Sequence, residues 1–242
     1  MLDVTQFNQI VLAPNATENA FACEVARLAS AAGPEGRYWG DGKKSLASSW
    51  AQGANKYAYR GRQFDAAWAA GAGVSAPTVA CQLKLAGPGA NSQSFYRYLH
   101  DVLICTLAQC FVPATAGVRH GCMAAIASGI RQPDWCRGRM LTGPVELRIT
   151  SDPNAPARDP DHAWIDTASG VIAPTGRSTI TWILLAQSGG PFGWWFRPGT
   201  LTIRFDQQVH HASGWDFLCA TPMAVELDGR PATEREVLHF LP

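Results

Sequence analysis

Apolar residues in the first half of the chain recur every three or four positions, a spacing that predicts helices. The first helix is expected over residues 15–32, where Phe21, Val25 and Leu28 fall on one face and Gly33-Pro34 ends the run. Further helices are expected over residues 45–54, around residues 64–68, and over residues 91–107, where the pattern is strongest.

Strict alternation of apolar and polar residues, which predicts half-buried strands, dominates the second half. It also occurs once in the first half, at residues 78–85. Strands are expected at residues 145–150, 178–186 and 201–206, with one or two more within 215–227. Asp228-Gly229 predicts a tight turn into a last strand at residues 237–241.

These elements predict an α+β fold, with a helical N-terminal half that contains one strand and a C-terminal half that is mostly antiparallel β-sheet. We expect one domain over residues 1–242. The alternative is a subdivision near Gly143, with residues 1–142 mainly helical and residues 143–242 mainly β.

Composition excludes several classes of protein. Hydrophobic residues make up 47% of the chain and charged residues only 16%, so the chain can bury a core and is not disordered. The formal net charge of +1 argues against a surface that binds nucleic acid throughout. No apolar run approaches the roughly 18–20 residues of a membrane helix, so no membrane partner is expected.

The N-terminus and the cysteines indicate where the protein is found. The first residues lack the basic and apolar regions of a secretory signal. The seven cysteines are an odd number and scattered, which is typical of reduced thiols inside a cell. We therefore expect a cytoplasmic protein, or one in a particle assembled in the cytoplasm.

One stretch has the residues of a thiol site. Cys122 precedes the small-residue segment 123–130, which we expect to begin a helix, and His162 follows on an expected strand. A helix N-terminus favours a thiolate, and a facing histidine can accept its proton. The alternative is that both residues belong to the hydrophobic core and have no catalytic role, because free cysteine is among the most buried residue types.

Around these two residues the chain resembles the transglutaminase-like branch of the papain-like cysteine hydrolases. The resemblance covers residues 121–175, in the phrases Gly121-Cys122, His162-Ala163-Trp164-Ile165 and Val171-Ile172-Ala173-Pro174-Thr175. It implies that Cys122 is the nucleophile and His162 the general base. Where the family has an Asp, this chain has Ala173. Asp166 could substitute only if its strand bends, because four strand residues span about 13 Å.

Two segments have the composition of binding surfaces. Residues 37–62 interleave cations with aromatics, a mixture that can hold phosphates, stack bases or dock a partner subunit. The alternative for this segment is a solvated helix with its aromatic face in the core. Gly193-Trp194-Trp195-Phe196-Arg197 has three consecutive aromatics, which cannot all face one core. The candidate nucleic-acid or partner-binding residues are Arg37, Lys43, Lys44, Lys56, Tyr57, Arg60, Arg62, Trp194 and Trp195.

No metal site or cofactor is expected. Cys105 and Cys110 have four residues between them, but Cys122 and Cys136 have thirteen, so no second close pair completes a zinc site. His210 and His211 are adjacent on an expected strand and should point to opposite faces.

An incomplete catalytic set is what chance produces in a cysteine-containing chain. We therefore favour a non-catalytic subunit of a larger intracellular assembly, of the virion or ribonucleoprotein type, that binds other protein subunits and also nucleic acid through residues 37–62. The alternative is a cysteine hydrolase or acyltransferase that uses Cys122, His162 and Asp166.

Overall fold

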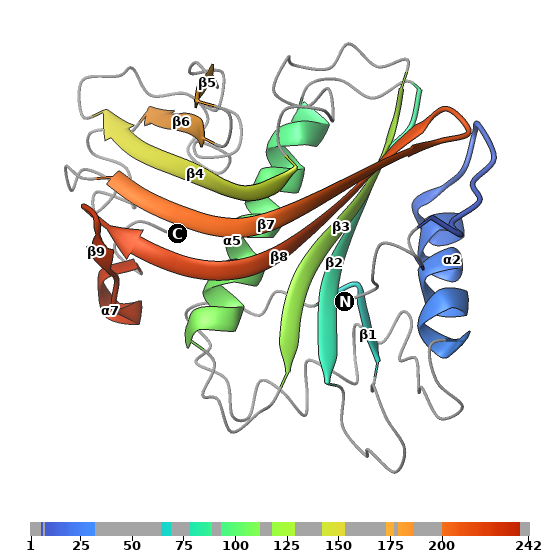
Figure 1. Cartoon of the computed structure of the whole chain (residues 1–242), viewed down its shortest axis with the longest axis horizontal. Coiled ribbons are helices and arrows are strands. Elements are labelled where there is room, and N and C mark those ends of the chain that lie inside the picture. Colours follow the sequence, from blue (N-terminus) through green and yellow to red (C-terminus); the bar gives the residue numbers. More distant parts are fainter. Residues whose placement is uncertain are drawn as a thin grey trace.

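The computed structural model describes residues 6, 8–31, 64–68, 78–88, 93–111, 118–128, 142–152, 173–176, 179–185 and 200–237. Within these ranges the strands form one mixed, strongly twisted sheet in the order β1-β2-β3-β8-β7-β4-β6-β5, with β9 paired to β8 (Figure 1). The strands are β1 (Ala66–Trp68), β2 (Val79–Ala86), β3 (Arg119–Ala127), β4 (Gly143–Asp152), β5 (Ala173–Gly176), β6 (Thr179–Leu185), β7 (Thr200–Ala212), β8 (Trp215–Leu227) and β9 (Arg230–Pro231).

Two long helices lie where periodicity predicts them. Thr17 is the N-cap of helix α2 (Glu18–Ala31). Its Oγ1 accepts a hydrogen bond of 3.2 Å from the Ala20 amide. Its apolar residues Phe21, Val25 and Leu28 are buried. Helix α5 (Gln93–Phe111) is buried at residues 98–99 and 101–108, and the short α7 (Glu234–Val237) follows β9.

The two long helices cover opposite faces of the sheet. The ring of Phe21 on α2 lies 6.4 Å from that of Phe217 on β8. Tyr98 on α5 instead bonds Gln207 on β7, which pairs with Ala220. Since side chains alternate between faces along a strand, Phe217 and Ala220 point to opposite sides. The centre of the sheet is therefore buried between α2 and α5.

The α+β class is confirmed, but the expectation of one strand in the N-terminal half is wrong. The described residues before Gly143 include β1, β2 and β3, and one sheet contains strands from both sides of that residue. The sheet is also mixed, because β2 pairs with β3, and β4 with β6, in parallel.

Three local predictions are wrong. Residues 66–68 form strand β1, and residues 123–127 continue strand β3, where we expected helices. Strand β3 lies in the middle of the sheet and is buried on both faces, so it lacks the alternating pattern that marks a half-buried strand. Val237 ends helix α7, although we expected it to begin a strand. The expected helix at 45–54 lies outside the described residues.

The strands expected at residues 78–85, 145–150, 178–186 and 201–206 are confirmed as β2, β4, β6 and β7. Residues 215–227 form a single strand, β8. The turn at Asp228-Gly229 is also confirmed, and both residues have positive φ, 51° and 79°. Among the described residues no helix is long and apolar enough to cross a membrane.

Candidate functional site

Cys122 does not lie at the N-terminus of a helix. It is the fourth residue of strand β3, between Gln82 on β2 and Ala220 on β8 in the sheet register. The prediction that it precedes a helix is therefore wrong, and with it the argument that a helix dipole favours its thiolate.

The environment of Cys122 disfavours ionisation. Its exposed fraction is 0%, and burial raises the pKa of the thiol well above its usual value, with the neighbouring Cys105 adding to the effect. A nucleophilic thiol needs an accessible, stabilised thiolate. This arrangement is that of a core residue.

The structure does not test the partners of Cys122 that the resemblance implies. His162 and Asp166 lie outside the described residues, and Ala173 begins strand β5. The resemblance to the transglutaminase-like hydrolases therefore rests on the sequence motif alone.

The cysteines on α5 also have separate surroundings. The Sγ of Cys105 is buried and donates to the carbonyl oxygen of Gly121 at 3.0 Å, whereas Cys110 is exposed. No group of three or more His, Cys, Asp or Glu side chains able to hold a metal occurs within the described ranges. Cys136 lies outside them.

A small polar cluster lies at the turn between β7 and β8. The Nδ1 of His211 lies 2.5 Å from the Oδ1 of Asp216, and the hydroxyl of Ser128 donates to the same oxygen at 3.2 Å. A catalytic relay needs the imidazole between hydroxyl and carboxylate. Here the carboxylate is in the middle, so the cluster ties β3 to the turn rather than activating Ser128. His210 instead stacks on Phe217, at 6.5 Å between ring centres.

All the predicted binding residues from Arg37 to Arg62, together with Trp194 and Trp195, lie outside the described residues. Their roles stay predictions.

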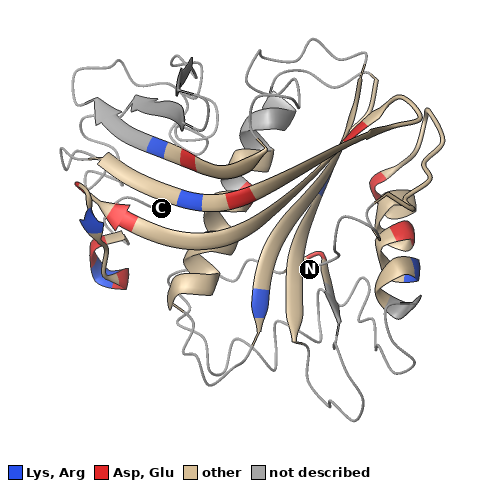
Figure 2. Ribbon diagram, in the orientation of Figure 1, with Lys and Arg blue, Asp and Glu red and all other residues tan. Residues whose placement is uncertain are grey.

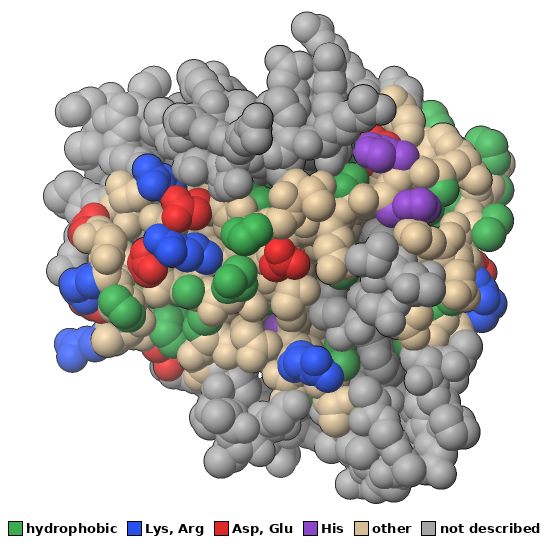
Figure 3. Space-filling model, in the orientation of Figure 1, with side chains coloured by type: hydrophobic (Ala, Val, Ile, Leu, Met, Phe, Trp, Pro, Cys, Tyr) green, Lys and Arg blue, Asp and Glu red, His purple; other side chains and the backbone are tan. Residues whose placement is uncertain are grey.

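The described residues contain a different candidate surface. It lies on the same face of the sheet as α2, but at the opposite end of that face. There β4, β7 and β8 carry several charged residues (Figure 2), and Figure 3 shows charged side chains at the surface of this side of the molecule. We call this surface the charged face and define it by Glu146, Arg148, Arg204, Asp206, Met223 and Glu226.

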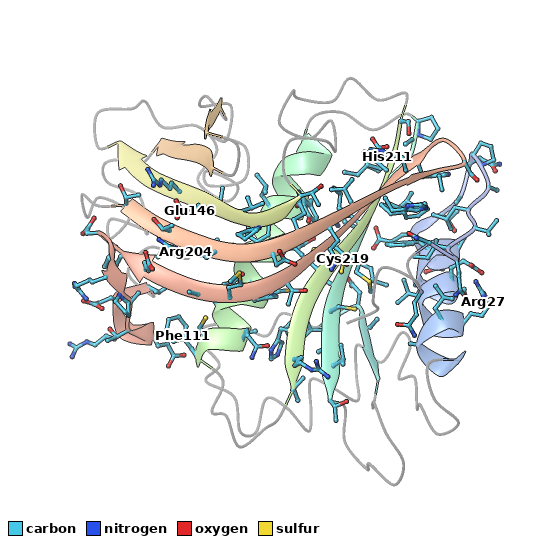
Figure 4. The ribbon with its side chains drawn as sticks, viewed as in Figure 1. Arg27, Phe111, Glu146, Arg204, His211 and Cys219 are labelled. Atoms are coloured by element: carbon cyan, nitrogen blue, oxygen red, sulfur yellow. The ribbon has the colours of Figure 1, made fainter. Side chains whose placement is uncertain are left out.

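Ion pairs join the three strands across the charged face. Arg204 on β7 contacts Glu146 on β4 at 3.1 Å and Glu226 on β8 at 3.2 Å. Figure 4 shows Glu146 and Arg204 side by side on the neighbouring strands β4 and β7. Arg148 contacts Glu146 at 3.0 Å. The side chains of Arg148 and Arg204 are nevertheless 50% and 45% exposed, so the arginines remain accessible to a partner.

A β-bulge places an apolar side chain among these charges. The register of β7 and β8 shifts between Arg204 and Phe205, so that Met223 is the extra residue on β8. Its neighbours Thr221 and Ala224 pair with Asp206 and Arg204, on the charged face. Met223 is 56% exposed, and among the described residues Val11 is the other large apolar residue that is exposed.

Sequence reasoning missed the charged face. The alternation of Glu146 with Arg148, and of Arg204 with Asp206, was visible as strand pattern. What the pattern does not give is that β4 pairs with β7 in a register that sets Glu146 opposite Arg204.

Comparison with known proteins adds no relative: no family model, no curated protein and no solved structure matches the chain.

Proposed function

We propose that this protein is a non-catalytic subunit of a larger assembly and that it binds other protein subunits through the charged face. The observation that carries the proposal is that the charged face is exposed at the end of the sheet that α2 does not cover. Helix α2 covers one end of this face, and the other end carries exposed arginines on β4 and β7 and an exposed methionine on β8. Arginine and methionine are enriched at protein interfaces.

The burial of Cys122 supports binding over catalysis. The residue best suited to be a nucleophile has no exposed surface and a raised thiol pKa. A hydrolase would need it open to a substrate and close to a general base.

The second part of the proposal is that residues 37–62 bind nucleic acid within such an assembly. Its support is the sequence, which interleaves lysine and arginine with tyrosine and tryptophan. Binding of this kind weakens steeply with salt. Affinity for a single-stranded oligonucleotide should fall in Lys56→Ala and Arg60→Ala but not in the control Arg230→Ala, which changes an exposed arginine on β9. Salt-independent binding would contradict this part.

The experiment that tests the main proposal compares three full-length variants. Each is purified from the cells that naturally make the protein, and the stoichiometry of co-purifying chains is measured by native mass spectrometry. We expect Cys122→Ser to keep its partners, and Arg204→Glu to lose them, because it reverses a charge between two carboxylates.

The matched control is Arg230→Glu. Arg230 is exposed and paired with Glu236, as Arg204 is paired, but it lies opposite Leu227 in the register, so its side chain belongs to the other face of the sheet from Glu226. This control should keep its partners. Loss of partners in Cys122→Ser alone, or a wild-type chain with no stoichiometric partner, would overturn the proposal.

A further inference from the structure

We propose that the partner of the charged face is the charged face of a second copy of this chain, related by a two-fold axis. This inference rests on the proposed function and identifies the partner chemistry of the same surface.

The first argument is the bonding capacity that the ion pairs leave unused. A guanidinium has five N–H donors, and the ion pairs that Arg204 and Arg148 form with described residues each use a single nitrogen of the guanidinium. Asp206 forms no ion pair with another residue that the structure describes. Among the described residues, the face thus presents donors and acceptors that no ion pair uses.

The second argument is the balance of charge. Two arginines face three acidic residues, so the charged face is close to neutral and slightly negative. A strongly basic or strongly acidic partner would find only half of the charged face complementary. A surface with the same interleaved charges fits it when rotated by 180°, because a two-fold interface is formed by the same patch on both copies.

The third argument is the position of Met223. It lies among the charged residues and is exposed. Its flexible side chain can pack against the same methionine of the second copy. The charges supply the register of the two copies, and the methionines supply apolar contact between them.

The size of the face sets the strength of the expected contact. Three neighbouring strands span about 10 Å between their axes, and the charged residues extend over about 13 Å along them, because they all fall at register positions 202–206 of β7. That is well below the roughly 800 Å² per partner of a standard stable interface. We therefore expect a weak dimer at this contact, which repetition in an assembly would strengthen.

The test is sedimentation equilibrium of the purified full-length chain at low salt, at concentrations up to about 1 mM. We expect a monomer–dimer equilibrium that shifts toward monomer as salt is added. Arg204→Glu and Met223→Lys should each weaken the dimer about tenfold or more. The matched controls Arg230→Glu and Val11→Lys change exposed residues elsewhere and should leave it unchanged.

A pair of charge-reversed chains separates a lost contact from a damaged fold. Arg204→Glu leaves one arginine against four acids, and Glu146→Arg with Glu226→Arg gives four arginines against one acid. Each chain alone should be monomeric. Mixed, they should form a heterodimer that is tighter than the wild-type dimer.

Two results would overturn the inference: a wild-type chain that stays monomeric over the whole range, or a dimer that Arg204→Glu and Met223→Lys leave intact. If the wild-type chain is monomeric but holds a different protein in a complex that Arg204→Glu disrupts, the inference fails and the proposed function stands. If neither complex exists, both fail.

Discussion

Tyr98 on α5 donates a hydrogen bond of 2.8 Å from its hydroxyl to the Oε1 of Gln207 on β7. The two residues are buried and 109 positions apart in the chain. This bond connects the long helix of the first half to a strand of the second. It lies beneath β7 and β8, on the face opposite the charged face, and so belongs to the support of that surface.

Replacing Tyr98 by Phe should lower the free energy of unfolding by about 1–2 kcal/mol, because a buried acceptor loses its donor. Chemical denaturation followed by circular dichroism measures this. The control is Thr106→Val, where the lost hydroxyl donates to the Val102 carbonyl of the same helix. A Tyr98→Phe chain as stable as wild type would show that this bond does not hold α5 to the sheet.

The cysteines should differ sharply in reactivity. Cys23 is exposed and should be alkylated within minutes at neutral pH, whereas Cys122 and Cys105 are buried with raised pKa values and should react only on unfolding. Cys110 is exposed but its pKa is also raised, so it should react more slowly than Cys23. Mass spectrometry of the peptides over time gives the order. Alkylation of Cys122 at the rate of Cys23 would revive the hydrolase hypothesis.

Stability should fall as the pH is lowered, and His120 should contribute to this. Burial lowers the pKa of His120 to about 3, from an ordinary value of 6.5. The unfolded chain therefore takes up a proton below pH 6.5 that the folded chain does not. The stabilisation by neutral His120 is complete above pH 6.5 and is lost progressively as the pH falls toward 3.

This contribution amounts to at most about 1.4 kcal/mol per pH unit between those limits. Urea denaturation at a series of pH values should give a smaller slope for His120→Gln than for wild type, whatever the substitution does at neutral pH. Equal slopes for the two proteins would mean that His120 is protonated in the fold.

The turn at Asp228-Gly229 should depend on the aspartate. Asp228 has a positive φ and its Oδ1 accepts a hydrogen bond of 2.9 Å from the Thr200 amide. Asp228→Ala loses both the acceptor and a residue type that tolerates this conformation, and should cost about 1–2 kcal/mol in thermal or chemical unfolding. Asp228→Asn keeps both features and should be nearly neutral. If the alanine variant matches the asparagine variant, the turn is not held in this way.

Local periodicity was enough to predict several elements of this fold. Strands β4 and β7 bury one face more than the other over residues 145–148 and 203–207, so polar and apolar residues alternate there with the period of a strand. Strand β3 was missed because both of its faces are covered. With alanines at 124, 125 and 127, its apolar run is equally typical of a helix.

The candidate surface needed information that periodicity does not contain. Glu146 and Arg204 are far apart in the chain, and only the antiparallel register of β4 with β7 makes them neighbours. The same limit applied to Cys122. Its local phrase resembled a catalytic motif, and only the position of β3 between β2 and β8 showed that the thiol is enclosed.

The most direct measurement of the central claim is the mass of the species that contains this chain in a fresh extract of the cells that naturally make it. Sedimentation velocity with antibody detection would give this mass for wild type and for Cys122→Ser. If the protein is an assembly subunit, both chains should sediment at the same rate, as species much larger than the 26.0 kDa single chain. A chain that sediments as a 26.0 kDa monomer at its natural concentration would contradict the account.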